Sequence, residues 1–169
     1  MSHTVRDAAA ADLPGILAIY NDAIATSTAV YTEAAQTLGD RQAWFAQRTA
    51  LGYPVLVASG PAGEVLGFSS FGDFRPWPGY RHTVEHLVYV AAGARGQGIG
   101  HALVRPLFGL AAARGKHTMI AGIDAANAPS IRLHERLGFA HAGVLREVGT
   151  KFGRWLDLVF MQRMLDPPG

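Results

Sequence analysis

Six consecutive residues, Arg95-Gly-Gln-Gly-Ile-Gly100, combine a cation with three alternating glycines, as a phosphate-binding turn would require. The preceding segment, 83–90, alternates and is rich in β-branched residues, which predicts a strand, and the apolar residues after the turn recur at helical spacing. The first N–H groups of a helix are free to bind anions, and glycine lets a diphosphate approach the backbone closely. The sequence therefore predicts a diphosphate site at 95–100, with an ordinary strand-to-helix loop as the alternative.

Two common phosphate motifs do not fit this turn. A Walker loop ends in Gly-Lys-Ser or Gly-Lys-Thr, whereas here Gly100 is followed by His101. The dinucleotide fingerprint has the spacing Gly-x-Gly-x-x-Gly, but Gly96, Gly98 and Gly100 follow the spacing Gly-x-Gly-x-Gly. The remaining pattern, Arg-x-x-Gly-x-Gly, resembles the pyrophosphate motif by which the GNAT superfamily of N-acetyltransferases holds acetyl-CoA.

Glu85 is the acidic residue with the clearest catalytic potential. Period-two alternation places it on one face of the predicted strand 83–90, and His82 and His86 on the other. A carboxylate in an apolar strand is costly to bury unless it is paired or functional. Two readings follow: an ion pair with Arg81 or another cation, or a general base that deprotonates an amine.

The same strand contains the letters of an inverted zinc-protease motif, His82-Thr-Val-Glu-His86. That motif needs a helix to bring its residues to one face, whereas Thr83 and Val84 favour a strand. In a strand Glu85 points away from both histidines, so we expect no metal site.

A second polar cluster lies at 127–139. Pro129 suits the first turn of a helix, so Asn127 lies near its cap, and Ser130 and His134 share a face because they are four residues apart. Asn127 is either a simple helix cap or a ligand contact. His134 is either a partly exposed helix histidine or a participant in chemistry.

Composition bounds the class of protein. The 169 residues are 49% hydrophobic, which predicts one domain over 1–165 and a frayed tail at 166–169. A net charge of +2 with scattered basic residues does not indicate nucleic-acid binding, and no apolar run is long enough for a membrane span. The absence of cysteine excludes disulfides and thiolate chemistry and fits a cytoplasmic location.

The hydrophobic patterns predict an α/β (α+β mixed) protein with helices on both faces of a mixed sheet. Thr37 and Asp40 have the spacing of a capping box ahead of the second helix, and Asp12 can cap the first. The expected strands are 5–8, 54–58, 65–71, 83–90, 117–123, 142–149 and 155–164, and the expected helices begin near 12, 37, 98 and 129.

Over nearly its whole length the chain resembles GNAT acyltransferases, and within them the phosphinothricin and the methionine sulfone or sulfoximine N-acetyltransferases. The most specific markers are Tyr80-Arg-His-Thr-Val-Glu-His86, Val88-Tyr-Val90, Leu133-His-Glu-Arg-Leu-Gly-Phe139 and Lys151-Phe-Gly-Arg-Trp155. The resemblance implies the GNAT fold, a mostly antiparallel sheet of about seven strands flanked by about four helices. It also implies a homodimer, in which Lys151-Phe152 reaches toward the partner's site.

The resemblance also implies roles for individual residues. The backbone of Val88, Tyr89 and Val90 would bind the pantetheine amides, and Asn127 the cofactor arm. Glu85 would be the general base, and His134, near the thioester sulfur, would relay protons or protonate the departing thiolate. The pyrophosphate would be held by Arg95, Gly96, Gln97, Gly98, Ile99 and Gly100. The amino-acid substrate would be lined by Thr28, Tyr31, Arg75, Arg81 and Glu85, because guanidinium groups suit a carboxylate.

The expected function is acetyl-CoA-dependent acetylation of the α-amino group of a small amino acid, such as phosphinothricin, methionine sulfone or methionine sulfoximine. This activity would detoxify such compounds and give herbicide resistance. Leu87, where a small polar residue is expected, leaves the choice of amino acid open. The alternatives are another acceptor, such as a peptide N-terminus or an aminoglycoside, and an acyl-CoA-binding sensor without turnover.

Overall fold

The alternating segments form one sheet in the order β1-β2-β3-β4-β5-β7-β6, in a computed structural model that describes residues 2–166. Within these residues the strands are β1 (Thr4–Asp7), β2 (Val55–Ser59), β3 (Val65–Asp73), β4 (Thr83–Val90), β5 (Thr118–Asp124), β6 (Ala140–Lys151) and β7 (Arg154–Met164). Neighbouring strands run antiparallel except β4 and β5, which are parallel. The expected mixed, mostly antiparallel sheet is therefore confirmed.

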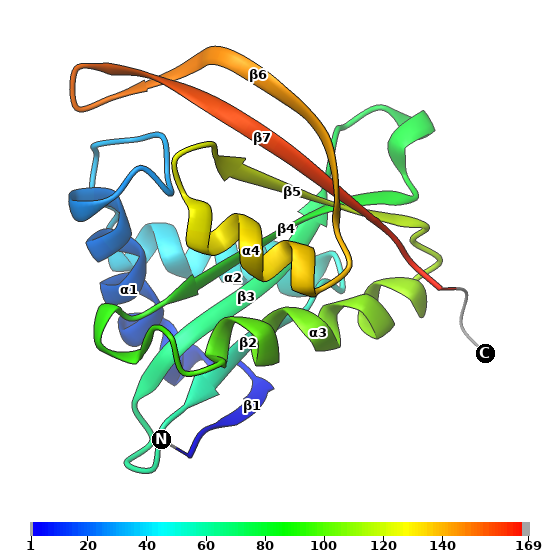
Figure 1. Ribbon diagram of the computed structural model, residues 1–169. Helices are drawn as coiled ribbons and strands as arrows, with labels where there is room; N and C mark the ends of the chain where they lie inside the picture. The colour runs from blue at the N-terminus through cyan, green and yellow to red at the C-terminus, as the bar shows by residue number, and fades with distance from the viewer. Residues whose placement is uncertain (1, 167–169) are drawn as a thin grey trace.

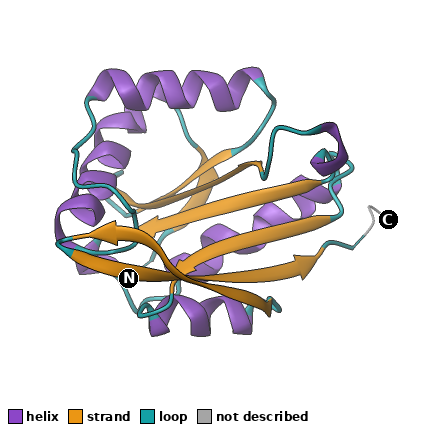
Figure 2. Ribbon diagram, turned by 90° about the horizontal axis from the view of Figure 1, so that it is seen from above, coloured by secondary structure: helices purple, strands orange, loops and turns teal. Residues whose placement is uncertain are grey.

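Helices cover both faces of this sheet (Figures 1 and 2). They are α1 (Leu13–Thr26), α2 (Leu38–Ala50), α3 (Ile99–Ala112) and α4 (Ala128–Arg136). In Figure 1, α3 and α4 lie in front of the strands, and α1 and α2 lie on the opposite side. The order of strands and helices along the chain agrees with the order expected from the hydrophobic patterns.

The side chains that precede α1 and α2 make different hydrogen bonds at the starts of these helices. At α2 the expected capping box forms, because the Asp40 N–H donates to Thr37 Oγ1 and the Thr37 N–H donates to Asp40 Oδ2. Asp12 precedes α1, but its carboxylate accepts from the Ala9 N–H and from both terminal nitrogens of Arg6. It therefore caps the short 3₁₀ turn at 10–12 and makes no capping bond to α1, contrary to the sequence-based expectation.

The two faces of β4 belong to two different cores. Val84 is fully buried beneath α3, whereas Leu87 and Tyr89 pack on the core formed with α1. This alternation confirms the predicted strand and places Glu85 on the face of α1 and α2.

β4 and β5 separate at their carboxyl ends (Figure 1). Their pairing extends from Thr83 and Thr118 only to Glu85 and Ile120, whereas β3 remains paired with β4 as far as Val90. One backbone edge of 86–90 therefore faces an opening instead of a neighbouring strand.

None of the helices in the described part of the chain is long and apolar enough to cross a membrane. The single-domain boundary at 1–165 stays a prediction, and the frayed tail expected at 166–169 falls outside the described residues except for residue 166.

Candidate active site

A cavity of about 730 Å³ lies where β4 and β5 part. Its wall is built from five segments far apart in the sequence: α1 with the residues after it, the end of β4, the turn into α3, α4 with the residues before it, and the turn between β6 and β7. Of the residues predicted to bind the cofactor or substrate, those on this wall are Thr28, Val88, Tyr89, Val90, Arg95, Gly96, Gly98, Ile99, Gly100 and Asn127.

The three glycines of the 95–100 turn serve two different purposes. Gly96 and Gly98 have φ values of +75° and +80°, in the left-handed region that favours glycine. A Cβ at Gly100 would lie 3.0 Å from the side chain of Leu133, so glycine here lets α3 approach α4 closely.

The beginning of α3 leaves free N–H groups beside the cavity. The first bond of the helix runs from the Ala102 N–H to the Gly98 carbonyl, so the N–H groups of Ile99, Gly100 and His101 have no helical acceptor. These donors and the positive end of the helix dipole favour an anion at this end of the cavity.

Side-chain charge supports the same conclusion. The charged side chains on the described wall are all basic, and no Asp or Glu is among them; they are Arg95, Arg136 and Arg154, with His101 beside them. Arg95 is folded back on the turn, because its Nε donates to the Val90 carbonyl at 3.2 Å. The cavity therefore suits a ligand with a polyanionic end and an uncharged arm.

Asn127 has the capping role weighed from the sequence, and its amide group is also placed at the cavity. Its Oδ1 accepts from the Ser130 N–H at 3.2 Å and caps α4. Its amide nitrogen makes no hydrogen bond to residues 2–166, and the residue lines the cavity. One side chain thus fixes the helix and offers a donor to a ligand.

Glu85 does not line this cavity: it lies at the last pair that β4 makes with β5, opposite Ile120, and it is close enough to the cavity-lining Tyr89 for its charge to add to the rise that burial causes in the pKa of that phenol. A Cβ on Gly122 of β5 would lie 3.0 Å from Glu85 Oε1, so the missing side chain at 122 leaves room for the carboxylate. Glu85 forms no ion pair with any described residue, and the pair with Arg81 weighed from the sequence does not form. Burial raises the pKa of the Glu85 carboxyl, and the charge of Arg75 partly opposes this rise.

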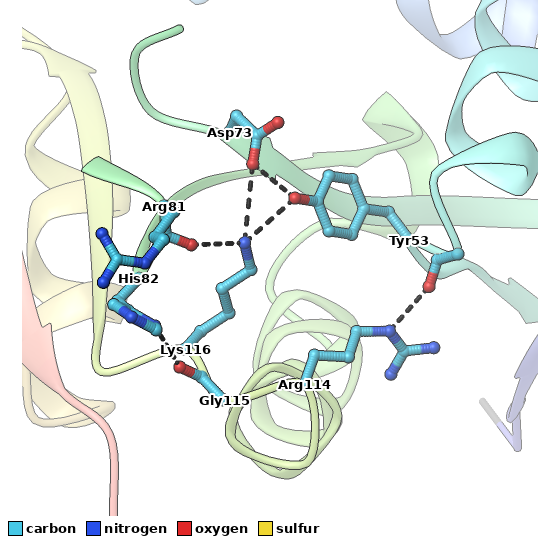
Figure 3. Close-up of polar contacts among 8 residues, drawn as sticks. Tyr53, Asp73, Arg81, His82, Arg114, Gly115 and Lys116 are labelled. Carbon is cyan, nitrogen blue, oxygen red and sulfur yellow. Dashed lines mark hydrogen bonds and ion pairs between the residues drawn. The ribbon is translucent and has the colours of Figure 1, made fainter. Parts of the chain in front are cut away.

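A lysine holds both ends of the loop that carries Arg75 and Arg81 (Figure 3). Lys116 Nζ donates to the Arg81 carbonyl at 2.7 Å and to the Tyr53 hydroxyl at 3.1 Å, and lies 3.5 Å from Asp73 Oδ1. Asp73 begins the loop and Arg81 ends it, so one ammonium group closes it. The Arg81 guanidinium is exposed and donates to Pro78 of the same loop.

Thr28 and Tyr31 belong to a segment that is tied to the sheet. Thr28 Oγ1 donates to Asp124, and the Tyr31 hydroxyl donates to the Asp157 carbonyl at 3.0 Å. Burial raises the pKa of Tyr31 to about 12, so its phenol stays protonated at neutral pH. Thr28 reaches the cavity wall, whereas Tyr31 does not.

Lys151 fastens the same segment from β6. It is 2% exposed, and its Nζ donates to the carbonyls of Ser27 at 2.6 Å and Val30 at 2.9 Å. The Lys151 ammonium group is therefore bound within its own chain, whereas the sequence had led us to expect that Lys151-Phe152 reaches toward a partner's site. Phe152, the next residue, lines the cavity of its own chain.

Two predicted site residues lie behind the cavity wall. Gln97 braces the turn, since its Nε2 donates to the Gly93 carbonyl at 3.3 Å. His134 is 2% exposed and not a partly exposed helix residue; its Nδ1 lies 2.7 Å from the Ser130 carbonyl and its Nε2 lies 3.0 Å from His86 Nε2. Neither ring nitrogen of His134 is free to meet a ligand.

Among the wall and support residues that the sequence did not predict are Arg136, Arg154 and Asp124. The two arginines stand inside motifs that the sequence had singled out, Leu133–Phe139 and Lys151–Trp155, so their charge was the available signal. Asp124 had no local signal, because its partner Thr28 is distant in the sequence. No cluster of three or more His, Asp or Glu side chains suited to a metal ion occurs among residues 2–166.

The chain is similar to a known protein family, to named relatives and to solved structures. Residues 16–139 match the family model described as the acetyltransferase (GNAT) family. The chain is 57% identical to an L-methionine sulfoximine/L-methionine sulfone acetyltransferase of Pseudomonas paraeruginosa, over 99% of this chain and 97% of that protein. A putative acetyltransferase from Salmonella typhimurium, solved with its cofactor acetyl-CoA, superposes with a TM-score of 0.94 at 46% identity, covering 98% and 95% of the two chains. A phosphinothricin acetyltransferase from Sinorhizobium meliloti, in complex with acetyl-CoA, gives a TM-score of 0.94 at 42% identity, covering 98% and 89%.

Proposed function

The chain belongs to the GNAT family of acetyltransferases, and from this premise we propose that it acetylates the α-amino group of a small amino acid with acetyl-CoA. Methionine sulfone, methionine sulfoximine and phosphinothricin are the first candidates, because relatives are named for acting on them. Acetylation of these compounds would detoxify them and give resistance to phosphinothricin as a herbicide.

The observation that carries the proposal is the match between the cavity and acetyl-CoA. The free N–H groups at 99–101 and the basic wall suit a pyrophosphate. The unpaired edge of Val88–Val90 suits the amides of a pantetheine arm, which can hydrogen-bond as a further strand would. The free amide group of Asn127 is an additional donor for this arm.

When bound, acetyl-CoA supplies an acetyl group activated as a thioester. Glu85 is the group suited to take a proton from the attacking amine, directly or through water, because α-amino groups are mostly protonated at neutral pH. A raised carboxyl pKa makes this residue a better base near pH 7, since its conjugate acid is closer to the working pH. Backbone N–H groups near Val88 would stabilise the negative charge that develops on the acetyl oxygen.

Arg75 is the cation suited to the carboxylate of the amino acid. It is close enough to Glu85 to affect its pKa, and its guanidinium stacks 5.1 Å from the ring of Phe74. Arg81 would complete the binding loop, and Thr28 and Tyr31 would line the opposite side. An amino acid held by its carboxylate would present its α-amino group toward Glu85.

We further propose a homodimer formed through the β6–β7 surface and a cytoplasmic location. β6 is an edge strand, paired only with β7, and its residues are mostly exposed. The exposed apolar side chains of this surface are Val144, Leu145, Val148 and Trp155, at 54%, 45%, 51% and 68%. Unpaired edges and contiguous apolar patches favour association. Light scattering tests the dimer: the molar mass of Val148→Glu is expected to be half that of the wild type.

Two other functions are compatible with the same cavity: acetylation of a different amine, such as a peptide N-terminus or an aminoglycoside, and acyl-CoA sensing without turnover. The loop anchored by Lys116 carries two arginines and favours a small anionic acceptor. A thiol-release screen with acetyl-CoA separates these functions. Turnover with methionine sulfone, methionine sulfoximine or phosphinothricin supports the proposal. Faster turnover of peptides or aminoglycosides, or binding without thiol release on any amine, contradicts it.

A further inference from the structure

Two histidines form a buried pair between β4 and α4. His86 Nε2 and His134 Nε2 are 3.0 Å apart, and the rings stack with centroids 5.0 Å apart at 29°. His86 is 7% exposed and His134 2%. Phe139 packs against both rings, at centroid distances of 5.5 Å and 5.1 Å. The short contact between nitrogens therefore lies in apolar surroundings, where it needs one donor and one acceptor.

The hydrogen-bond partners determine where the protons are. The Ser130 carbonyl can only accept, so His134 Nδ1, 2.7 Å away, carries the proton. Neutral His134 then has a lone pair on Nε2, and His86 must donate to it from its own Nε2. His86 Nδ1 is left as a buried lone pair with no partner among the described residues. Burial lowers the pKa of both imidazoles, so both rings stay neutral near pH 7.

This pair connects the two walls of the cavity. His134 is the one buried side chain of α4, the helix that also presents Ser130 and Leu133 to the cavity. His86 lies two residues before Val88, at the point where β4 has left β5. Ile131 and Leu133 of α4 pack against the core, and His134 adds a directional hydrogen bond to the strand that forms the opposite wall.

We propose that the His86–His134 pair is a positioning device that sets the separation of α4 from the open edge of β4, and with it the affinity of the cavity for acetyl-CoA. The proposal rests on the proposed function above. It gives His86 a role in cofactor binding. It also changes the role of His134, whose N–H points into its own helix and cannot protonate a thiolate in the cavity.

Calorimetric titration of acetyl-CoA into four variants tests the pair. His86→Leu and His134→Leu each remove the hydrogen bond, and both are expected to weaken binding by about tenfold, raising KM more than they lower kcat. His86→Gln keeps an N–H donor at a similar reach and is expected to restore most of the affinity. His117→Gln, at an exposed histidine whose side chain makes no hydrogen bond to the described residues, is the control and should bind as the wild type does.

Unaltered acetyl-CoA affinity in folded His86→Leu overturns the proposal, as does a loss of kcat confined to His134→Leu with normal affinity, which would indicate acid catalysis. Failure of the wild type to bind acetyl-CoA refutes instead the proposed function. Nitrogen-15 NMR of the wild type at pH 7 provides a test that needs no variant. The pair predicts protonated Nδ1 on His134 and protonated Nε2 on His86, and any other tautomers contradict it.

Discussion

Replacement of Lys151 by methionine is expected to destabilise the protein by about 2–4 kcal/mol. The ammonium group donates to two carbonyls, Ser27 O at 2.6 Å and Val30 O at 2.9 Å, in a residue that is 2% exposed. Hydrogen bonds from a charged donor contribute roughly 1.5–3 kcal/mol each, and the loss of the donor leaves both carbonyls unsatisfied. The cost of burying the lysine, which also lowers its pKa, offsets part of that sum. Methionine fills much of the space of the stem, so the lost bonds dominate the change.

Thermal unfolding measures this effect. For a chain of this size about 1 kcal/mol shifts the melting temperature by roughly 2–4 °C, so Lys151→Met should melt about 5–15 °C below the wild type. Arg105→Met is the matched control: it also removes one positive charge, but from an exposed side chain of α3 without a hydrogen bond to any described residue. Because Ser27 and Thr28 line the cavity, the KM for substrate should rise in Lys151→Met alone. A melting temperature equal to that of Arg105→Met would refute the assigned role of Lys151.

Three further outcomes follow from the packing. Between pH 6.5 and about pH 3, the free energy of unfolding measured by urea titration should fall less for His86→Leu than for the wild type. Burial and His134 lower the pKa of the native His86 to about 3, so it stays neutral while the unfolded imidazole takes up a proton, which costs the wild type up to about 1.4 kcal/mol of stability per pH unit. Equal acid sensitivity of the two proteins would contradict this. Gly100→Ala should weaken acetyl-CoA binding severalfold in calorimetry, because its Cβ would lie 3.0 Å from Leu133 and push α4 outward, and unchanged affinity would show that the close approach is unimportant. Lys116→Met should raise the KM for the amino acid and leave the affinity for acetyl-CoA unchanged, because it frees the loop end at Arg81. Steady-state kinetics with both substrates test this, and a raised KM for acetyl-CoA with an unchanged KM for the amino acid would contradict it.

Local sequence signals were sufficient for most of the fold. Alternation predicted the 83–90 strand with its correct faces, and the Thr37–Asp40 spacing predicted the start of α2, because both patterns act over a few neighbouring residues. Asp12 shows the limit of such signals. Its type and position suited a cap of α1, but Arg6 and the Ala9 N–H compete for the same carboxylate, and only the folded chain shows which contacts form.

The candidate site was predictable where it depends on backbone and not where it depends on distant side chains. Gly96 and Gly98 are visible in the sequence as residues that can adopt the left-handed conformation that the turn has at these positions. The partner of His134 is 48 residues away, and the carbonyls that hold Lys151 are more than 120 residues away. Neither pairing has a local pattern, so the sequence left His134 either partly exposed or catalytic, and Lys151-Phe152 was expected to reach toward a partner's site.

We propose that Glu85 deprotonates an amine beside acetyl-CoA bound in the cavity. The most direct test is the pH dependence of thiol release by the wild type and by Glu85→Gln, with saturating acetyl-CoA and the best acceptor from the screen. Glu85→Gln is expected to bind acetyl-CoA normally, to lose about 10²–10⁴ in rate, and to lose the acidic limb of the wild-type pH profile. That limb lies above the range of an ordinary carboxyl because burial raises the Glu85 pKa. A variant that keeps the wild-type rate and pH profile would contradict the proposal.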